Sequence, residues 1–261
     1  SNTTASNNTA VGYQAGYANT TGTDNTAVGY QAAYNNTSGS IITAVGYQCL
    51  YSNTTGIDNH AFGDRALRAN TTGADNAAFG YATLFSNTTG SHNTAFGALA
   101  LLNNTTASNN TAFGYQAGYS NTTGANNIAL GNGALNSNTT ASNNTAVGYQ
   151  AGYSNTTGTQ NNFFGTQAGY SSTTDNQAFF GYQAGYNTTT GTQNVASSST
   201  PSASFSKGTE IASPLATAYT APVDAYSAPS YNPAQLQEIQ QAKNGGIIHK
   251  AGGGGLSLTP T

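Results

Sequence analysis

The sequence predicts an all-β fold, a parallel β-solenoid built from coils of seventeen residues. Two observations support this prediction: a glycine recurs every seventeen residues, and the residues around it keep a fixed pattern. A repeat this short cannot hold a helical hairpin, because helical repeats need about 33 residues or more. The recurring glycines are Gly12, Gly29, Gly46, Gly63, Gly80, Gly97, Gly114, Gly131, Gly148 and Gly165, followed after sixteen residues by Gly181.

Eleven full units cover residues 8–193, and residues 1–198 are predicted to form one rod. Position one of the unit is Asn in nine units, and position three is Ala in nine units and Phe163 and Phe179 in the last two. Position four is always Val, Leu or Phe, and the tyrosines of the array occupy positions six and ten. Stacked coils place identical side chains above one another, so we expect an Asn amide ladder and stacked Tyr columns.

Each unit contains three kinds of local structure. "TAVG" predicts a short strand closed by a glycine that can adopt a positive φ, "QAGY" and its variants a second short strand, and "NTTG" a turn. Strand alternation places positions three and four on opposite apolar faces, so both faces need cover.

We expect position four to fill the coil interior, and the small position three to face partner chains near the axis of a homotrimer. A monomeric coil is the alternative. The predicted core residues are Val11, Val28, Val45, Phe62, Phe79, Phe96, Phe113, Leu130, Val147, Phe164 and Phe180.

The composition argues against several classes of function. Charged residues make up only 5% of the chain, against about 25% in typical soluble domains. Without a basic stripe to neutralise phosphates, no nucleic-acid partner is expected. No apolar run approaches about 18 residues, so no membrane insertion is expected either. The lone cysteine, Cys49, takes the place of Ala at a small core position, which predicts a buried and inert thiol.

Catalytic candidates are few. No His, Cys and Asp cluster has metal-ligand spacing, and no nucleophile has a base beside it, so we expect no enzyme, no metal and no cofactor. The densest charges of the array are Asp64, Arg65 and Arg68 in unit four, which predict a local salt bridge or a surface patch.

Position twelve carries a repeated N-x-Ser/Thr acceptor pattern. In a secreted eukaryotic protein these asparagines would hold glycans in a row along the rod, and otherwise they are plain turns. The predicted glycosylation candidates are Asn19, Asn36, Asn53, Asn70, Asn87, Asn104, Asn121, Asn138 and Asn155.

After residue 198 the composition changes. Residues 199–231 are rich in Ser, Pro and Ala and are predicted to form an extended linker. Residues 232–261 are predicted to hold one short helix, with Asn232 as N-cap, Pro233 in the first turn and Gly245 at the end, followed by a Gly-rich tail. We expect 199–261 to attach the rod to a virion or surface protein, or to support trimerisation. A disordered tail is the alternative.

The "NTAVG" strand at seventeen-residue spacing resembles the S-x-A-I-G head repeats of trimeric autotransporter adhesins, although with a longer period. Those heads are left-handed parallel β-rolls of three chains. The fuller unit, at 144–158 and 110–124, is similar to repeats of bacteriophage tail and head fibres. The resemblance covers 1–198 and implies adhesion or receptor binding.

These observations favour a non-enzymatic structural fibre. We expect a trimeric rod that projects from the surface of a phage virion and binds host surfaces or glycans. The alternative is a self-assembling bacterial or extracellular surface filament or adhesin, glycosylated on its N-T-T turns.

Overall fold

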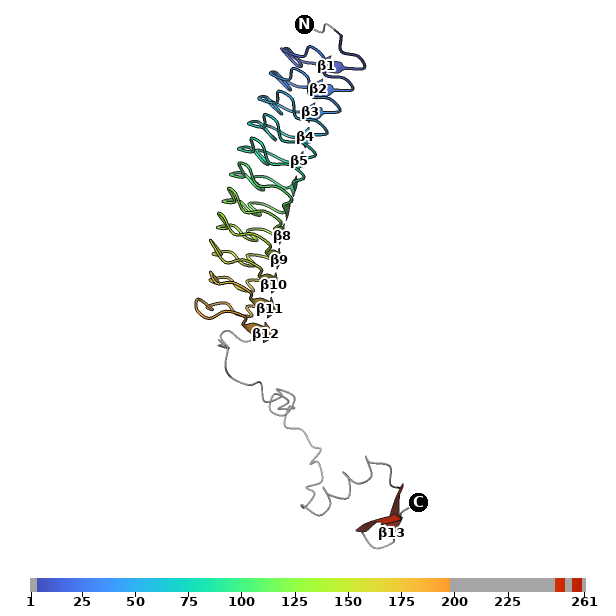
Figure 1. Ribbon diagram of the computed structural model, residues 1–261, viewed down its shortest axis with the longest axis vertical. Helices are drawn as coiled ribbons and strands as arrows, with labels where there is room; N and C mark the ends of the chain where they lie inside the picture. Colours follow the sequence, from blue (N-terminus) through green and yellow to red (C-terminus); the bar gives the residue numbers. More distant parts are fainter. Residues whose placement is uncertain (1–3, 198–246, 252–254, 260–261) are drawn as a thin grey trace. The chain divides into compact units, whose positions relative to one another are not determined.

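A computed structural model describes residues 4–197, 247–251 and 255–259 of the chain. The repeat region winds into a solenoid with one three-residue strand per coil, and the strands stack along one side of the rod (Figure 1). The strands are β1 (Thr9–Val11), β2 (Thr26–Val28), β3 (Thr43–Val45), β4 (His60–Phe62), β5 (Ala77–Phe79), β6 (Thr94–Phe96), β7 (Thr111–Phe113), β8 (Ile128–Leu130), β9 (Thr145–Val147), β10 (Asn162–Phe164), β11 (Ala178–Phe180) and β12 (Val195–Ser197).

The twelve strands form one parallel sheet in sequence order. Each residue pairs with its equivalent in the next coil, as Ala78 does with Ala95. The shortened coil keeps the register, because Phe163 still pairs with Phe179. The predicted all-β parallel solenoid is confirmed. The array also continues one strand beyond the eleven predicted units, since β12 pairs with β11.

Glycine at position five ends each strand for two reasons. Gly114 adopts a φ of 131°, a conformation that side-chain-bearing residues rarely take. A Cβ at this glycine would also lie 2.6 Å from the carbonyl oxygen of Gly131 in the next coil. The strand therefore turns where two backbones approach too closely for any side chain, as a solenoid corner requires.

The predicted second strand is wrong, because positions seven to ten form a turn. Gln48 and Leu50 have φ values of 50° and 49°, the left-handed region that an extended strand excludes. Their N–H groups point to opposite neighbours: Gln48 donates to the Tyr30 carbonyl in the preceding coil, and Leu50 donates to the Ala66 carbonyl in the following one. Bonds to both neighbouring coils stabilise this unfavourable backbone conformation.

The coil interior is filled from positions three, eight and nine. Where position three is Ala, position nine is often Leu, as in Ala44 and Leu50, and both are fully buried. Where position three is the larger Phe163, position nine is Gly169, whose missing side chain leaves room for the ring. In most coils, the narrow interior thus holds one large side chain from position three or position nine.

The prediction that position four fills the interior is wrong. Phe62, Phe113 and Phe180 are 38%, 43% and 46% exposed, and the other position-four side chains are half-buried or exposed. Strand alternation was predicted correctly, but the two faces were exchanged. Alanine suits the inside because strand and turn lie close together there, and the bulky residues point outward.

Near the C-terminus, β13 (Ile247–Ala251) pairs antiparallel with β14 (Gly255–Thr259). Neither strand was predicted from the Gly-rich sequence. The predicted linker at 199–231 and the predicted helix after Asn232 lie outside the described residues.

Candidate binding surface

Within the described residues, no three His, Cys, Asp or Glu side chains are grouped as a metal site would require. The described part of the chain also contains no helix that is long and apolar enough to cross a membrane. The candidate functional features of the rod are therefore its interior ladders, its voids and its repeated outer surface.

Position twelve forms a continuous ladder of buried amides from Asn19 to Asn155. In the middle of the ladder, Asn87 Nδ2 donates to Asn70 Oδ1 at 2.8 Å and to the Gly90 carbonyl at 2.9 Å. Its Oδ1 accepts from Asn104 Nδ2 at 2.9 Å. The predicted Asn ladder is confirmed here, and it lies inside the coil.

This ladder is incompatible with the predicted glycosylation. All nine candidate asparagines are buried, with exposed fractions between 0 and 6%. A glycan is attached to Nδ2, the atom that bonds both the neighbouring amide and the turn carbonyl. A modified asparagine would have to leave the ladder, and the buried polar groups of its neighbours would then lack hydrogen-bond partners. In the folded rod the N-T-T segments are therefore turns.

Position one forms a second set of buried amides. Asn76 Oδ1 accepts the backbone N–H of Asn93 at 3.0 Å, and Asn76 Nδ2 donates to the Gly90 carbonyl at 2.9 Å. Both Asn sets therefore bond the same turn carbonyl from two sides. These hydrogen bonds explain why Asn recurs at two positions of the unit.

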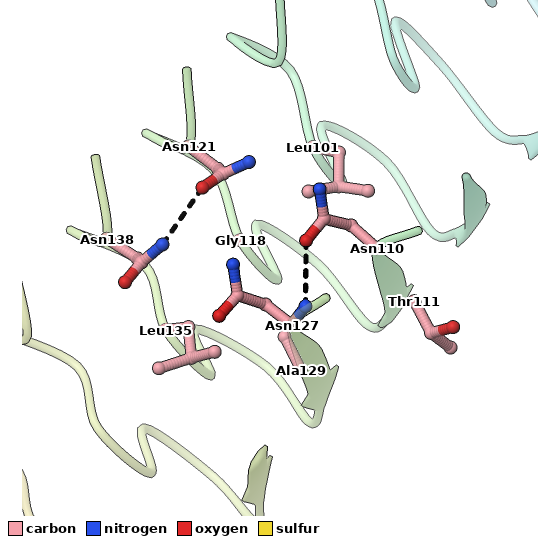
Figure 2. Close-up of a pocket in the computed structure, with 9 residues that line it drawn as sticks. All are labelled: Leu101, Asn110, Thr111, Gly118, Asn121, Asn127, Ala129, Leu135 and Asn138. Carbon is pink, nitrogen blue, oxygen red and sulfur yellow. Dashed lines mark hydrogen bonds between the residues drawn. The ribbon is translucent and has the colours of Figure 1, made fainter. Parts of the chain in front are cut away.

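Voids interrupt the packing of the described coils in unit seven and among the first three coils. In unit seven, Gly118 replaces the usual leucine between Leu101 and Leu135, beside the bonded pair Asn121 and Asn138 (Figure 2). The void there measures about 10 Å³, which is room for at most one water.

A larger void of about 220 Å³ lies among the first three coils, where Gly16 and Ala33 stand at position nine. No charged side chain lines either void.

The outer face of the sheet carries a column of stacked apolar side chains. The ring centroids of Phe62 and Phe79 are 4.8 Å apart, those of Phe79 and Phe96 4.3 Å, and those of Phe96 and Phe113 4.7 Å. Position two, most often Thr, lies on the same face by strand alternation. We call positions two and four of the strands the outer sheet face. Its position-four column is continuous, apolar and partly exposed, and position two beside it is mostly polar.

The predicted tyrosine columns are confirmed where tyrosines stand in consecutive coils, and they are interrupted elsewhere. At position six, Tyr30 stacks on Tyr13 and Tyr47 with centroid distances of 5.3 and 5.2 Å. Position ten has comparable stacks, such as Tyr153 on Tyr170 at 5.1 Å. Within these stacks, the ring faces contact each other and mainly the ring edges remain for solvent.

In unit four the charged side chains extend the aromatic columns. Arg68 occupies position ten, where most units carry tyrosine. Its guanidinium lies 5.3 Å from the ring centroid of Tyr51 and 5.7 Å from the ring centroid of Phe85. Arg65 lies 5.8 Å over Tyr47. The arginines therefore make cation–π contacts. The predicted salt bridge with Asp64 is absent from the ion pairs found among the described residues.

Cys49 lies inside the coil at position eight, as predicted. Its Sγ donates to the Ala61 carbonyl at 3.2 Å, and burial raises the pKa of the thiol to about 12. The thiol is therefore protonated at neutral pH and cannot act as a nucleophile there.

Among the described residues, one His–Asp contact lies on the turns. His92 Nε2 is 3.6 Å from Asp75 Oδ2, and both side chains are exposed.

No family model, curated protein or solved structure matches the chain. The sequence interpretation missed two features. One is the exposure of position four, which only the structure shows. The other is an alternation of Tyr with shorter residues at position six from Asp64 onward, which the aligned units already contain.

Proposed function

We propose that the chain is a non-enzymatic structural fibre, a trimeric rod that projects from a phage virion and binds host-surface glycans. The observation that supports the trimer is the outer sheet face. Parallel sheets are normally covered on both faces, and here the coil covers only one. An exposed apolar patch that runs along a whole rod is typical of a protein–protein contact.

The copies are proposed to meet through the outer sheet face, so the proposed axis lies beside position four and not beside position three. Position-four side chains of parallel copies would lie at equal heights, because every coil rises by the same step of about 4.8 Å. The resemblance to trimeric head repeats and phage fibre repeats supports three copies and the virion surface.

The trimer is tested by sedimentation equilibrium on the full chain. The expected mass is three times 26.4 kDa. In the double variant Phe79→Asp and Phe96→Asp, buried charges would oppose association, and we expect single chains with an unchanged circular-dichroism spectrum. Thr72→Asp with Thr89→Asp is the matched control, because it adds the same charge on exposed turns. A wild-type protein that sediments as one chain would contradict the proposal.

The virion location is tested separately. Antibodies against the rod should label fibres on purified phage particles in electron micrographs. Labelling of bacterial cell surfaces without phage would instead support the alternative of a bacterial surface filament.

A further inference from the structure

Position six changes its pattern along the rod. In units one to three it is occupied by three consecutive tyrosines, which stack on one another. From unit five onward a tyrosine stands only in every second coil, with a shorter residue between. The order is Tyr81, Ala98, Tyr115, Asn132, Tyr149, Thr166 and Tyr182.

The alternation creates gaps of defined width. Position six stays in register from coil to coil, because Gln150 N–H donates to the Asn132 carbonyl and Gln183 N–H to the Thr166 carbonyl, both at 2.9 Å. Tyrosines two coils apart are therefore separated by about 9.6 Å along the rod, twice the spacing of neighbouring strands.

A gap of this width admits one ring in contact with both walls. The first three units show the spacing that one inserted ring needs, since Tyr30 fits between Tyr13 and Tyr47 at centroid distances of 5.3 and 5.2 Å. In unit four, where Asp64 replaces the tyrosine, the flat guanidinium of Arg65 lies over the Tyr47 ring at 5.8 Å. The first gap is therefore already lined by a planar group of the chain.

Three further gaps follow, at Ala98, Asn132 and Thr166, and only the last two carry a polar side chain at position six. Both residues are exposed and too short to reach across a gap. Next to Asn132 stands Gly133, which has no side chain. Next to Thr166, Gln167 is held in an amide ladder, donating to Gln150 at 3.0 Å and accepting from Gln183 at 2.9 Å. Neither neighbour fills its gap.

The walls of these gaps are about half exposed. Tyr115, Tyr149 and Tyr182 are 49%, 49% and 53% exposed, between the values of the stacked tyrosines Tyr30 (43%) and Tyr13 (62%). The surroundings are also uncharged, because residues 76–174 contain no Asp, Glu, Lys or Arg. The gaps therefore favour a neutral occupant with one flat apolar face on each side and polar groups at its edge.

We propose that the gaps Tyr115–Tyr149 and Tyr149–Tyr182 each bind one neutral pyranose ring. Its C–H faces would pack on the negative faces of the tyrosine rings. Its hydroxyls would bond the Asn132 amide in one gap and the Thr166 hydroxyl in the other. The ring enters edge-on, so the ligand is a terminal or branch sugar and not a polysaccharide lying along the rod. This inference rests on the proposed glycan adhesion and names its site.

The experiment is saturation-transfer NMR on the full chain with methyl β-D-galactopyranoside and methyl β-D-glucopyranoside. The double variant Asn132→Tyr and Thr166→Tyr closes both gaps and should fold, because units one to three already carry consecutive tyrosines. We expect it to lose binding by about tenfold or more. Thr72→Tyr with Thr89→Tyr adds the same rings on exposed turns and should leave binding unchanged.

A second variant tests the converse. Tyr30→Thr opens a new gap between Tyr13 and Tyr47, and should add sugar binding at the other end of the rod. Broadening of the assigned ring signals of these two tyrosines would report it.

Three results would overturn the inference: no saturation transfer to either sugar, transfer that survives closure of the gaps, or binding of N-acetyltyrosinamide in place of the sugars. The last would indicate that the gaps accept tyrosines of a second copy. Sedimentation of the same samples separates the two proposals. A trimer that binds no sugar overturns only this inference, and a single chain that binds sugar overturns only the trimer.

Discussion

At the scale of single residues, buried amides outnumber large buried apolar side chains in the described part of the rod. In the middle of the position-twelve ladder, Asn87 has its side-chain donors and acceptor matched by neighbours above, below and in its own turn. Such a network is stable only when it is complete, because a buried polar group without a partner is costly. The recurrence of Asn is explained by this requirement.

Replacing one ladder amide should be costly. Asn87→Ala removes the partners of the Asn70, Asn104 and Gly90 groups, and we expect a loss of about 3 kcal/mol in unfolding free energy. Thr89→Ala, on the exposed turn of the same coil, should change it by less than about 0.5 kcal/mol. Chemical denaturation and amide hydrogen exchange of units four to six measure both. Equal effects of the two substitutions would contradict the role of the ladder.

The buried thiol gives a pH-dependent prediction. In the unfolded chain Cys49 ionises near its ordinary pKa of 9.0, whereas burial raises the folded pKa to about 12. The unfolded state therefore loses its proton first, and stability falls as pH rises from 9 toward 12, by at most about 1.4 kcal/mol per pH unit.

The control for the thiol is Cys49→Ala, which installs the residue most common at this position and should remove this part of the pH dependence. Tyrosine ionisation affects both proteins alike, so the difference between their denaturation curves isolates the thiol. A native thiol that reacts with a disulfide reagent at pH 8 as fast as in denaturant would contradict its burial.

At the scale of the coil, the side chain at position three of the strand and the side chain at position nine of the turn share one interior space. Coils with Ala at position three can carry Leu at position nine, whereas the coils with Phe163 and Phe179 carry Gly169 and Gly185. The backbone stays the same in both kinds, because strand pairing forces one register on every coil. Where one of the two positions is large the interior is filled, and where both are small, as in unit seven with Ala112 and Gly118, a void is left.

A double-mutant cycle tests this exchange. Phe163→Ala should cost about 3–5 kcal/mol through the cavity it leaves, and Gly169→Leu should destabilise by overpacking against Phe163. Together the two substitutions recreate the Ala and Leu combination of units three to six, so the double variant should be more stable than either single one. Thermal unfolding measures all four proteins. Additive losses would show that the two positions do not share one space.

At the scale of the whole rod, each described coil contacts mainly its immediate neighbours, so length is set by the number of units. Deleting residues 110–126 joins unit six to unit eight in register and stacks Leu101 against Leu135, as Leu84 and Leu101 follow each other in units five and six. We expect a folded rod, shorter by about 4.8 Å.

Deletion of 110–118 is the control for register. It removes about half a coil and should prevent native strand pairing beyond the cut. Circular dichroism and small-angle scattering distinguish the two outcomes. If both deletions gave equally ordered rods, the seventeen-residue register would not be what holds the coils together.

Much of the candidate surface was also readable from the aligned units. The tyrosine columns followed from period alone, because in-register stacking brings Tyr13 over Tyr30 whatever the coil geometry. The gaps at Asn132 and Thr166 follow from the same register, since a shorter residue in a stacked column leaves space between its neighbours. Their accessibility does not follow, because exposure depends on which way position six points.

The sequence by itself determined the period, the parallel stacking, the glycine corners and the amide ladder, since each depends only on which residues recur at a fixed spacing. Only the tertiary structure decided which positions of the strand face the interior of the coil. A strand of Ala and Phe reads equally well in either orientation, and the outcome depends on the width of the coil. In the folded coil Ala78 lies within and Phe79 outside. The N-T-T asparagines that looked like glycan acceptors lie in the same interior, bonded to one another.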